Sequence, residues 1–285
     1  MRHIENLDLT EYNSYRLKAI CAHAFFPDSE EELRQIYRDR KDTKKILLGS
    51  GHNVILSKEY YEQDFILFSG NFDSILINGN NIVAEAGATM LELSTRALEH
   101  SLTGLEIFYD IPSSLGGAVV MNAGASGEEI KDILVKVRYY DIAKDEFGEM
   151  TNEEIGFSYR NSCFQNNPDL IVTKVWLELK SGGKNSIKEK MEQIKAARWA
   201  KQPRDYPNAG SVFKRPNGVY VGPMIEKLGL KGYRVGGAMV SEKHAGYIVN
   251  VNNASANDIL EIIDIIKSKL KLNYFIDIET EQRII

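Results

Sequence analysis

The feature that constrains this chain most is a stretch of small, almost uncharged residues between positions 111 and 127. It begins Ile-Pro-Ser-Ser-Leu-Gly-Gly-Ala, ends Met-Asn-Ala-Gly-Ala-Ser-Gly, and contains four glycines. Close packing against a neighbouring element explains part of the pattern, because residues without bulk let backbones approach one another. A backbone laid against a flat cofactor and its pyrophosphate explains better both the length of the stretch and its lack of large side chains.

A second candidate for a phosphate-binding turn is Gly49-Ser50-Gly51-His52-Asn53, which directly follows a predicted strand at 45–48. Two glycines permit a sharp turn and allow backbone N–H groups to point at a phosphate. The turn is not a Rossmann fingerprint, because the third glycine is missing and residues 54–56 predict a strand where that motif needs a helix. An ordinary tight turn is the alternative interpretation.

Composition limits the class of protein. The chain has 285 residues, 43% of them hydrophobic, and can therefore bury two or three compact cores. Its 35 basic and 40 acidic residues are interspersed, which argues against a nucleic-acid partner. The two cysteines, Cys21 and Cys163, are far apart, so neither a disulfide framework nor a zinc-ribbon site is indicated.

Targeting and metal signals are missing from the sequence. The first residues lack an apolar core of signal-peptide length, and no apolar run approaches the roughly 18 residues that span a membrane. No histidine or acidic cluster has metal-ligand spacing. We therefore expect a cytoplasmic protein with no membrane partner and no bound metal.

Periodicity predicts a mixture of helices and strands without regular alternation, which favours an α+β architecture of several small domains. Ser29 and Thr89 each precede a predicted helix and have a glutamate three residues later, as in a capping box. A linker at 181–185 precedes a helix capped by Ser186. Strands are predicted at 45–48, 82–86, 134–142 and 171–179, and the last two are expected to pair. A final amphipathic helix is predicted to bury its apolar face, which consists of Ile259, Ile262, Ile263, Ile266 and Leu270.

Three side chains are candidates for chemistry. Arg160 lies between an aromatic residue and small polar ones, a setting for bidentate grip on a carboxylate, although a solvated surface arginine is the usual case. Ser211 follows a glycine and precedes two cations, Lys214 and Arg215, which suit an anionic substrate. No nearby histidine or Gly-x-Ser-x-Gly elbow supports a hydrolase triad. Glu281 by itself is an ordinary exposed glutamate.

In order along essentially the whole chain, these segments resemble the UDP-N-acetylenolpyruvoylglucosamine reductases, also called UDP-N-acetylmuramate dehydrogenases, and most closely their shorter form. The resemblance is strongest at 111–132, at Tyr159-Arg160-Asn161-Ser162, and from 201 through 216 to 246. It implies three domains: two FAD-binding domains of the vanillyl-alcohol-oxidase-like type at 1–70 and 71–182, and a substrate-binding α+β domain at 183–285.

The resemblance also implies a reaction. NADPH reduces bound FAD and leaves, and the enolpyruvyl group of UDP-N-acetylglucosamine enolpyruvate then takes the hydride to give UDP-N-acetylmuramate. This step belongs to peptidoglycan precursor synthesis, and hence to cell-wall biogenesis, cell shape and cell division. The partners are these small molecules, and the protein is expected to be a monomer.

Roles follow residue by residue from the resemblance. Arg160 would stabilise the developing enolate. Glu281 would assist as a protonated acid, which requires a raised pKa, and Ser211 would protonate the α-carbon. Cofactor contacts are expected from Gly49, Ser50, Gly51, His52, Asn53, Pro112, Ser113, Ser114, Gly116, Gly117, Asn122, Ala123 and Gly124, and substrate contacts from Tyr159, Lys201, Lys214 and Arg215.

The chain departs from the family pattern at three points. Residues 14–22 lack the usual Gly-Gly pair, Ser113 replaces a glycine, and His52 stands where serine is common. His52 leaves two interpretations open: a covalent bond to FAD, as in related oxidases, or hydrogen bonds to phosphates or backbone. Two other functions remain as alternatives, an FAD-dependent oxidase of the same fold and a flavin or nucleotide-sugar binding protein without turnover.

Overall fold

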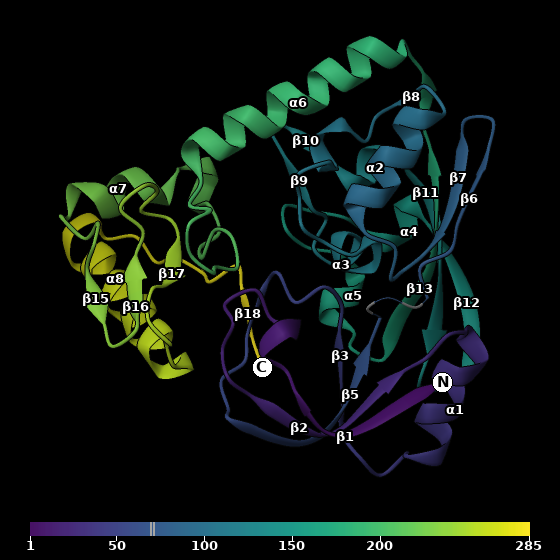
Figure 1. The fold of residues 1–285 in the computed structure, drawn as a ribbon, viewed down its shortest axis with the longest axis horizontal. Helices are drawn as coiled ribbons and strands as arrows, with labels where there is room; N and C mark the ends of the chain where they lie inside the picture. The colour runs from purple at the N-terminus through teal and green to yellow at the C-terminus, as the bar shows by residue number, and fades with distance from the viewer. Residues whose placement is uncertain (69, 71) are drawn as a thin grey trace. The chain divides into compact units, whose positions relative to one another are not determined.

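The structure is a computed structural model, and it describes residues 1–68, 70 and 72–285 (Figure 1). The chain divides into two compact units. Unit 1 comprises Met1–Ile4, His23–Ser50 and Gln63–Ala197, and unit 2 comprises Glu5–Ala22, Gly51–Glu62 and Arg198–Ile285. The division into three domains stays a prediction. Its first boundary, between residues 70 and 71, involves residue 71, which lies outside the described residues.

The first sheet has the strand order β1 (Arg2–Asp8), β2 (Ile20–Phe26), β5 (Tyr60–Leu67) and β3 (Lys45–Leu48), with β3 and β5 parallel. Helix α1 (Glu30–Asp39) begins after Ser29, whose hydroxyl accepts the Glu32 N–H at 3.2 Å. The expected capping box is incomplete, because the Glu32 carboxylate accepts the N–H of Asp28 at 2.7 Å instead of that of Ser29. Leu33 and Ile36 are buried as predicted.

A five-stranded antiparallel sheet forms the centre of unit 1. Its strands, in order, are β12 (Glu146–Thr151), β11 (Leu134–Asp141), β13 (Leu170–Glu178), β7 (Asn81–Glu85) and β6 (Ile75–Asn78). The predicted pairing of the two long strands, β11 and β13, is thus confirmed. Along β13 the residues Ile171, Thr173, Val175 and Leu177 are buried, as their alternation predicts.

Helices and short elements surround this sheet. Helix α2 (Met90–Glu99) is capped by Thr89, whose hydroxyl accepts the Glu92 N–H at 3.1 Å. Helix α3 (Leu115–Val120) lies within the small-residue stretch, and its Leu115, Ala118 and Val119 join the core that β13 and β7 line. Smaller elements of unit 1 are β8 (Leu102–Thr103), β9 (Gly124–Ala125), β10 (Glu128–Glu129), α4 (Asn152–Ile155), α5 (Cys163–Asn166) and β14 (Lys180–Ser181), with 3-10 turns at Glu106–Phe108 and Ile130–Asp132.

The long helix α6 (Lys184–Lys201) begins two residues before the predicted cap. Ser186 lies inside its first turn, and its hydroxyl donates to the carbonyl of Gly183 at 2.8 Å. Part of the predicted linker forms β14, which pairs with β8. The change from unit 1 to unit 2 falls near the other end of α6, between Ala197 and Arg198.

Unit 2 has its own apolar core. Its three-stranded sheet contains β15 (Arg234–Val235), β16 (Ala238–Val240) and β17 (Ile248–Asn250), and α7 (Val221–Lys227) and α8 (Ala256–Tyr274) pack with it. The unit also contains 3-10 turns at Thr10–Tyr12 and Pro216–Gly218 and the parallel pair β4 (Val54–Ile55) and β18 (Arg283–Ile284). The five predicted apolar residues of α8 are all buried.

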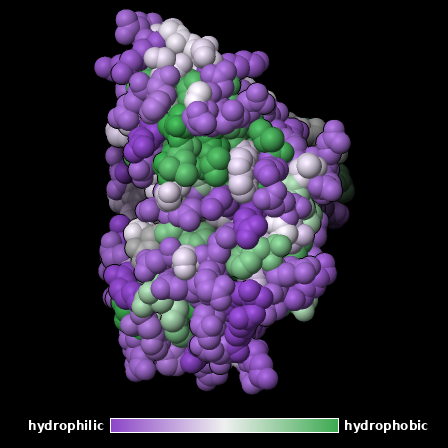
Figure 2. All heavy atoms as spheres, turned by 90° about the vertical axis from the view of Figure 1, so that its right-hand side faces the viewer, coloured by the Kyte–Doolittle hydropathy of each residue, from purple (hydrophilic) through white to green (hydrophobic). Residues whose placement is uncertain are grey.

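Polar side chains cover most of the face that Figure 2 shows, and apolar side chains gather there in limited patches. Within the described part of the chain, no helix combines the length and the apolar character that crossing a membrane requires.

Candidate active site

Two loops that the sequence predicts separately as cofactor-binding lie against each other in unit 1. The N–H of Ser114 donates to the hydroxyl of Ser50 at 3.2 Å. A Cβ atom added to Gly49 would lie 2.6 Å from the Ser114 hydroxyl oxygen, which is closer than real contacts allow. A side chain at position 49 would therefore displace the Ser114 hydroxyl, which accepts the Gly117 N–H at 3.3 Å at the start of α3.

Internal packing explains part of the small-residue stretch. A Cβ atom on Gly116 would lie 2.9 Å from the Cβ of Ala86, and one on Gly124 would lie 2.1 Å from the carbonyl oxygen of Glu128. The N–H groups of Leu115 and Gly116 donate to the carbonyls of Ala88 and Ala86, each at 2.8 Å. Helix α3 thus begins directly on the end of β7, as the close-packing interpretation expects.

The same stretch has little side-chain bulk where it is not fully buried. Ser113, Gly116, Gly117 and Ala123 are half-buried, and their backbone N–H groups are all donated within the protein. The absence of bulk permits stacking of a ring system. Close packing therefore accounts for Gly116 and Gly124, while the predicted contacts of the stretch with the cofactor stay predictions.

Asn122 shapes the loop from inside. Its side chain is fully buried, and its amide donates to the carboxylate of Glu129 and to the carbonyl of Ser158, each at 2.9 Å. Its carbonyl oxygen accepts the N–H of Lys131 at 3.4 Å. These contacts give Asn122 a structural role, while its predicted contact with the cofactor stays a prediction.

Arg160 is anchored to the same loop. Its Nη1 and Nη2 atoms donate to the carbonyls of Asn122 and Gly124 at 3.2 and 2.6 Å. The guanidinium lies 5.3 Å from the ring centroid of Tyr159, which is exposed. Arg160 also has a left-handed backbone with φ of 52°, a conformation that costs energy for a residue with a side chain and that often marks functional sites.

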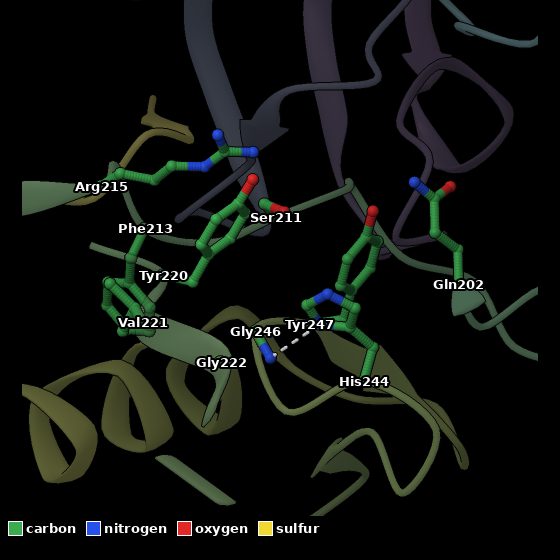
Figure 3. Close-up of a pocket in the computed structure, with 10 residues that line it drawn as sticks. All are labelled: Gln202, Ser211, Phe213, Arg215, Tyr220, Val221, Gly222, His244, Gly246 and Tyr247. Atoms are coloured by element: carbon green, nitrogen blue, oxygen red, sulfur yellow. Dashed lines mark hydrogen bonds between the residues drawn. The ribbon is translucent and has the colours of Figure 1, made fainter. Parts of the chain in front are cut away.

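Unit 2 contains a pocket around Ser211 (Figure 3). Figure 3 shows the hydroxyl groups of Ser211, Tyr220 and Tyr247 on the same side of it. Burial raises the pKa of the Tyr247 phenol. Ser211 is exposed, whereas Tyr247 is only 6% exposed. Two hydroxyl-bearing residues therefore line the same pocket, the exposed Ser211 and the buried Tyr247.

His244 lines the pocket as well, although it lies far from Ser211 in the sequence. Its Nδ1 accepts the N–H of Gly246 at 3.1 Å, and burial lowers its pKa. Its ring meets the ring of Tyr247 edge-on with centroids 4.8 Å apart. The imidazole is thus a neutral support for Tyr247, and because its Nδ1 is occupied, this nitrogen is no base for Ser211.

Two of the predicted substrate cations differ in their surroundings. The guanidinium of Arg215 lies 4.1 Å from the ring centroid of Tyr220 and lines the pocket. The Nζ atom of Lys214 instead pairs with the Glu279 carboxylate at 2.9 Å. Lys201 is exposed at the end of α6.

The C-terminal segment brings Glu281 beside the serine loop. The Glu281 N–H donates to the carbonyl of Val212 at 2.8 Å, and Phe213 and Thr280 form an antiparallel bridge. The amide of Asn53 donates to the Glu281 carbonyl at 3.3 Å. Residues distant in the sequence thus meet next to Ser211. Arg160 belongs to unit 1, whereas Ser211 and Glu281 belong to unit 2.

The altered segment at 14–22 is well anchored in unit 2. Tyr15 is fully buried, and its hydroxyl donates to the side chain of Gln282 at 3.0 Å. Its carbonyl accepts the amide of Asn250 at 2.8 Å. Gln282 in turn donates to the carbonyl of Ala209 at 3.0 Å, two residues before Ser211. The segment therefore supports the loop that carries Ser211.

Of the ten residues that line the pocket, only Ser211 and Arg215 were predicted as site residues; the others include the polar side chains of Gln202, Tyr220, His244 and Tyr247. Tyr247 resembles an ordinary core residue of a strand, and no spacing rule links it to Ser211. His244 and Gln202 lie in segments that support the family resemblance, and this was the only signal that could have found them.

Two matches to known domains cover most of the chain. Residues 21–147 match the FAD binding domain, and residues 202–285 match the C-terminal domain of UDP-N-acetylenolpyruvoylglucosamine reductase. Together with the α+β fold, these matches define the class as an FAD-dependent oxidoreductase.

Similar proteins match this chain over nearly its full length. The UDP-N-acetylenolpyruvoylglucosamine reductase of Syntrophomonas wolfei is 42% identical over 98% of this chain and 94% of its own length. That of Francisella tularensis is 38% identical and covers 99% of both chains. The crystal structure of the reductase from Thermus caldophilus has a TM-score of 0.84 at 31% identity, covering 99% of this chain and 98% of its own. The chain belongs to the UDP-N-acetylenolpyruvoylglucosamine reductase family.

This membership confirms the predictions made from the resemblance about fold, cofactor and activity. The protein is an FAD-dependent reductase of UDP-N-acetylglucosamine enolpyruvate in peptidoglycan precursor synthesis, and NADPH is its reductant.

Gly49→Ala tests the junction of the two loops. Because the new Cβ atom would meet the Ser114 hydroxyl at 2.6 Å, and overpacking costs ~1–3 kcal/mol, we expect FAD affinity to fall about tenfold in a fluorescence titration of the apoprotein. In Gly49→Ala/Ser114→Ala the clashing oxygen is gone, so the double variant should bind FAD better than the product of the single effects predicts. If the effects of the two single changes on the free energy of FAD binding were strictly additive, the proposed clash would be contradicted.

A precipitation experiment decides between the two interpretations of His52, whose side chain is exposed. We expect the flavin to remain in solution when the denatured protein is precipitated with acid, because imidazole commonly serves as a hydrogen-bonding group. Absorbance of the supernatant measures the released flavin. Flavin retained in the pellet of the natural chain, but released from His52→Ala, would establish the covalent bond instead.

Proposed function

We propose that this chain divides the chemistry among Arg160, Ser211 and Glu281, and that Tyr247 assists Ser211. When bound, FAD supplies the hydride that the substrate's double bond receives, after taking it from NADPH. The observation that carries the proposal is the pocket in unit 2, which is lined by both the exposed Ser211 and the buried Tyr247. The backbone pairing of Glu281 with Val212 beside it supports the same assignment.

Charge stabilisation is the role proposed for Arg160. When hydride adds to the terminal carbon of the enolpyruvyl group, electron density moves into the carboxylate and an enolate develops. A fixed cation stabilises this charge without reorganising. The two carbonyl contacts of Arg160 hold its guanidinium in a set orientation before substrate arrives, and a planar group with five donors suits a carboxylate. Tyr159 supports it through the ring contact.

Proton delivery to the α-carbon is the role proposed for Ser211. Its exposed hydroxyl can reach a substrate in the pocket, and proton transfer leaves an alkoxide behind. The Tyr247 hydroxyl, which belongs to the same pocket, then stabilises the alkoxide and returns a proton to it. This direction is favourable because a phenol is a stronger acid than an aliphatic alcohol, even where burial raises the phenol's pKa.

Glu281 is proposed as a protonated acid that assists the enolate. A carboxyl group in this role must keep its proton near neutral pH, through burial or a neighbouring negative charge. Glu281 is half-buried, and its main chain is held on both sides by Val212 and Asn53. A fixed main chain limits the positions that its carboxyl can adopt.

Recognition of the nucleotide sugar is proposed for the cations around the pocket. Arg215 lines it, and Lys201 and Lys214 lie on the segments that lead into and out of the serine loop. A guanidinium stacked on the Tyr220 ring keeps its edge available for the oxygens of a diphosphate. We also propose a cytoplasmic monomer. The compartment is supported by the sequence, which has only two cysteines, far apart along the chain.

Ser211→Ala separates the two half-reactions. In anaerobic stopped-flow absorbance, bleaching of the flavin by NADPH should be unchanged, because Ser211 serves only the second step. Recovery on adding the enolpyruvyl nucleotide sugar should slow by about 10²–10⁴-fold, the usual contribution of a general acid. Tyr247→Phe keeps Ser211 and should slow recovery less.

Equal impairment of both half-reactions by Ser211→Ala would contradict its role as acid. The same absorbance measurement on the natural chain distinguishes the reductase from the two alternative functions, an oxidase and a binding protein without turnover. Flavin that bleaches and recovers only with oxygen would favour an oxidase. Flavin that never bleaches with NADPH would favour a binding protein without turnover.

Arg160→Lys tests the guanidinium. Lysine keeps the charge but cannot contact two carbonyls and a carboxylate in a fixed plane, so flavin recovery with substrate should slow by about 10²-fold or more, comparable to loss of an oxyanion donor. Arg96→Lys, a change in a surface pair of α2, is the matched control and should leave both half-reactions unchanged. Near-normal recovery in Arg160→Lys would remove Arg160 from the mechanism.

A further inference from the structure

Two histidines outside the reaction machinery meet on the first sheet of the protein. His3 lies on β1 and His23 on the neighbouring strand β2. Their Nε2 and Nδ1 atoms are 3.2 Å apart, and their ring centroids are 5.3 Å apart. Their separation in the chain is 20 residues, which is no known metal-ligand spacing, so the sequence alone did not reveal the pair.

The distance between the two nitrogens suits a shared metal ion. Zinc binds imidazole nitrogen at about 2.0–2.1 Å, and a tetrahedral angle then places two such nitrogens roughly 3.3–3.4 Å apart. The observed 3.2 Å differs from this by only a few tenths of an ångström. We propose that His3 and His23 form a two-imidazole site for Zn²⁺ or a similar divalent transition metal.

Packing orients one of the two rings before any ion binds. The His3 ring stacks on the ring of Phe25, with centroids 4.4 Å apart and planes inclined by 4°. Phe25 is almost fully buried in the core of unit 1, so it provides a rigid base. A ligand that is already ordered loses less conformational entropy on binding, and this favours the bound state.

Chemistry favours a borderline metal over Mg²⁺ or Ca²⁺. Imidazole suits zinc, copper and nickel, whereas the hard cations prefer oxygen ligands. Glu5 follows His3 by two residues on β1, so its side chain leaves the same face of the strand and offers a carboxylate as a further ligand. Water completes the coordination, since His3 is exposed and His23 half-buried.

Without metal, the two imidazoles hydrogen-bond each other, one donating and one accepting. When Zn²⁺ binds, the donating ring carries its proton on its other nitrogen instead, so both imidazoles stay neutral and each gives the metal one lone pair. The site has no link to the reductase pocket in its chemistry, so it can be tested without reference to turnover.

The test uses the holoenzyme with any affinity tag removed and a chromophoric indicator that competes for Zn²⁺. We expect the natural chain to take one Zn²⁺ from the indicator, and His3→Ala and His23→Ala each to lose at least about tenfold in affinity, because each removes one of two anchoring ligands. His100→Ala, a change at an exposed histidine of unit 1, is the matched control and should bind like the natural chain.

A second measurement identifies the ligands. Co²⁺ in place of Zn²⁺ should give the visible absorption of imidazole-bound cobalt in the natural chain and in His100→Ala, and not in His3→Ala or His23→Ala. Flavin absorbance and circular dichroism show whether each variant is folded. No uptake of Zn²⁺ by the natural chain, or equal uptake by all variants, would overturn the proposal.

Discussion

The contact between the loop after β3 and the loop before α3 is the constraint on which unit 1 depends. Glycine at position 49 leaves room for the Ser114 hydroxyl, which a Cβ atom there would displace, and the hydrogen bond from Ser114 to Ser50 holds the two loops together. From this junction α3 starts directly on β7. The small residues that remain half-exposed can then face a flat cofactor.

The small-residue stretch also orients the Arg160 guanidinium in unit 1. Its carbonyls at Asn122 and Gly124 accept the two Arg160 donors, and the buried Asn122 amide closes the turn from inside. A cation that must stabilise a transient negative charge is most effective when its orientation is set in advance. The loop that fits the cofactor therefore also positions the arginine proposed for the enolate.

In unit 2 the polar pocket depends on a chain of contacts through buried side chains. Tyr15 and Gln282 link the N-terminal segment, the C-terminal segment and the backbone before Ser211. His244, whose pKa is lowered by burial, packs against Tyr247, and Tyr247 lines the pocket together with Ser211. A weak acid such as a serine hydroxyl becomes useful when its neighbours fix its position and return its proton.

The sequence by itself determined the local elements and the family. The alternation along β13 and the apolar face of α8 identify their buried sides, since side-chain periodicity is a local property. Only the tertiary structure decided which residues meet. The pocket shared by Tyr247 and Ser211, the pairing of Glu281 with Val212 and the pair of His3 and His23 each join segments whose patterns carry no information about their partners. The path of the chain through the fold determines which distant segments become neighbours, and this path is a property of the whole fold.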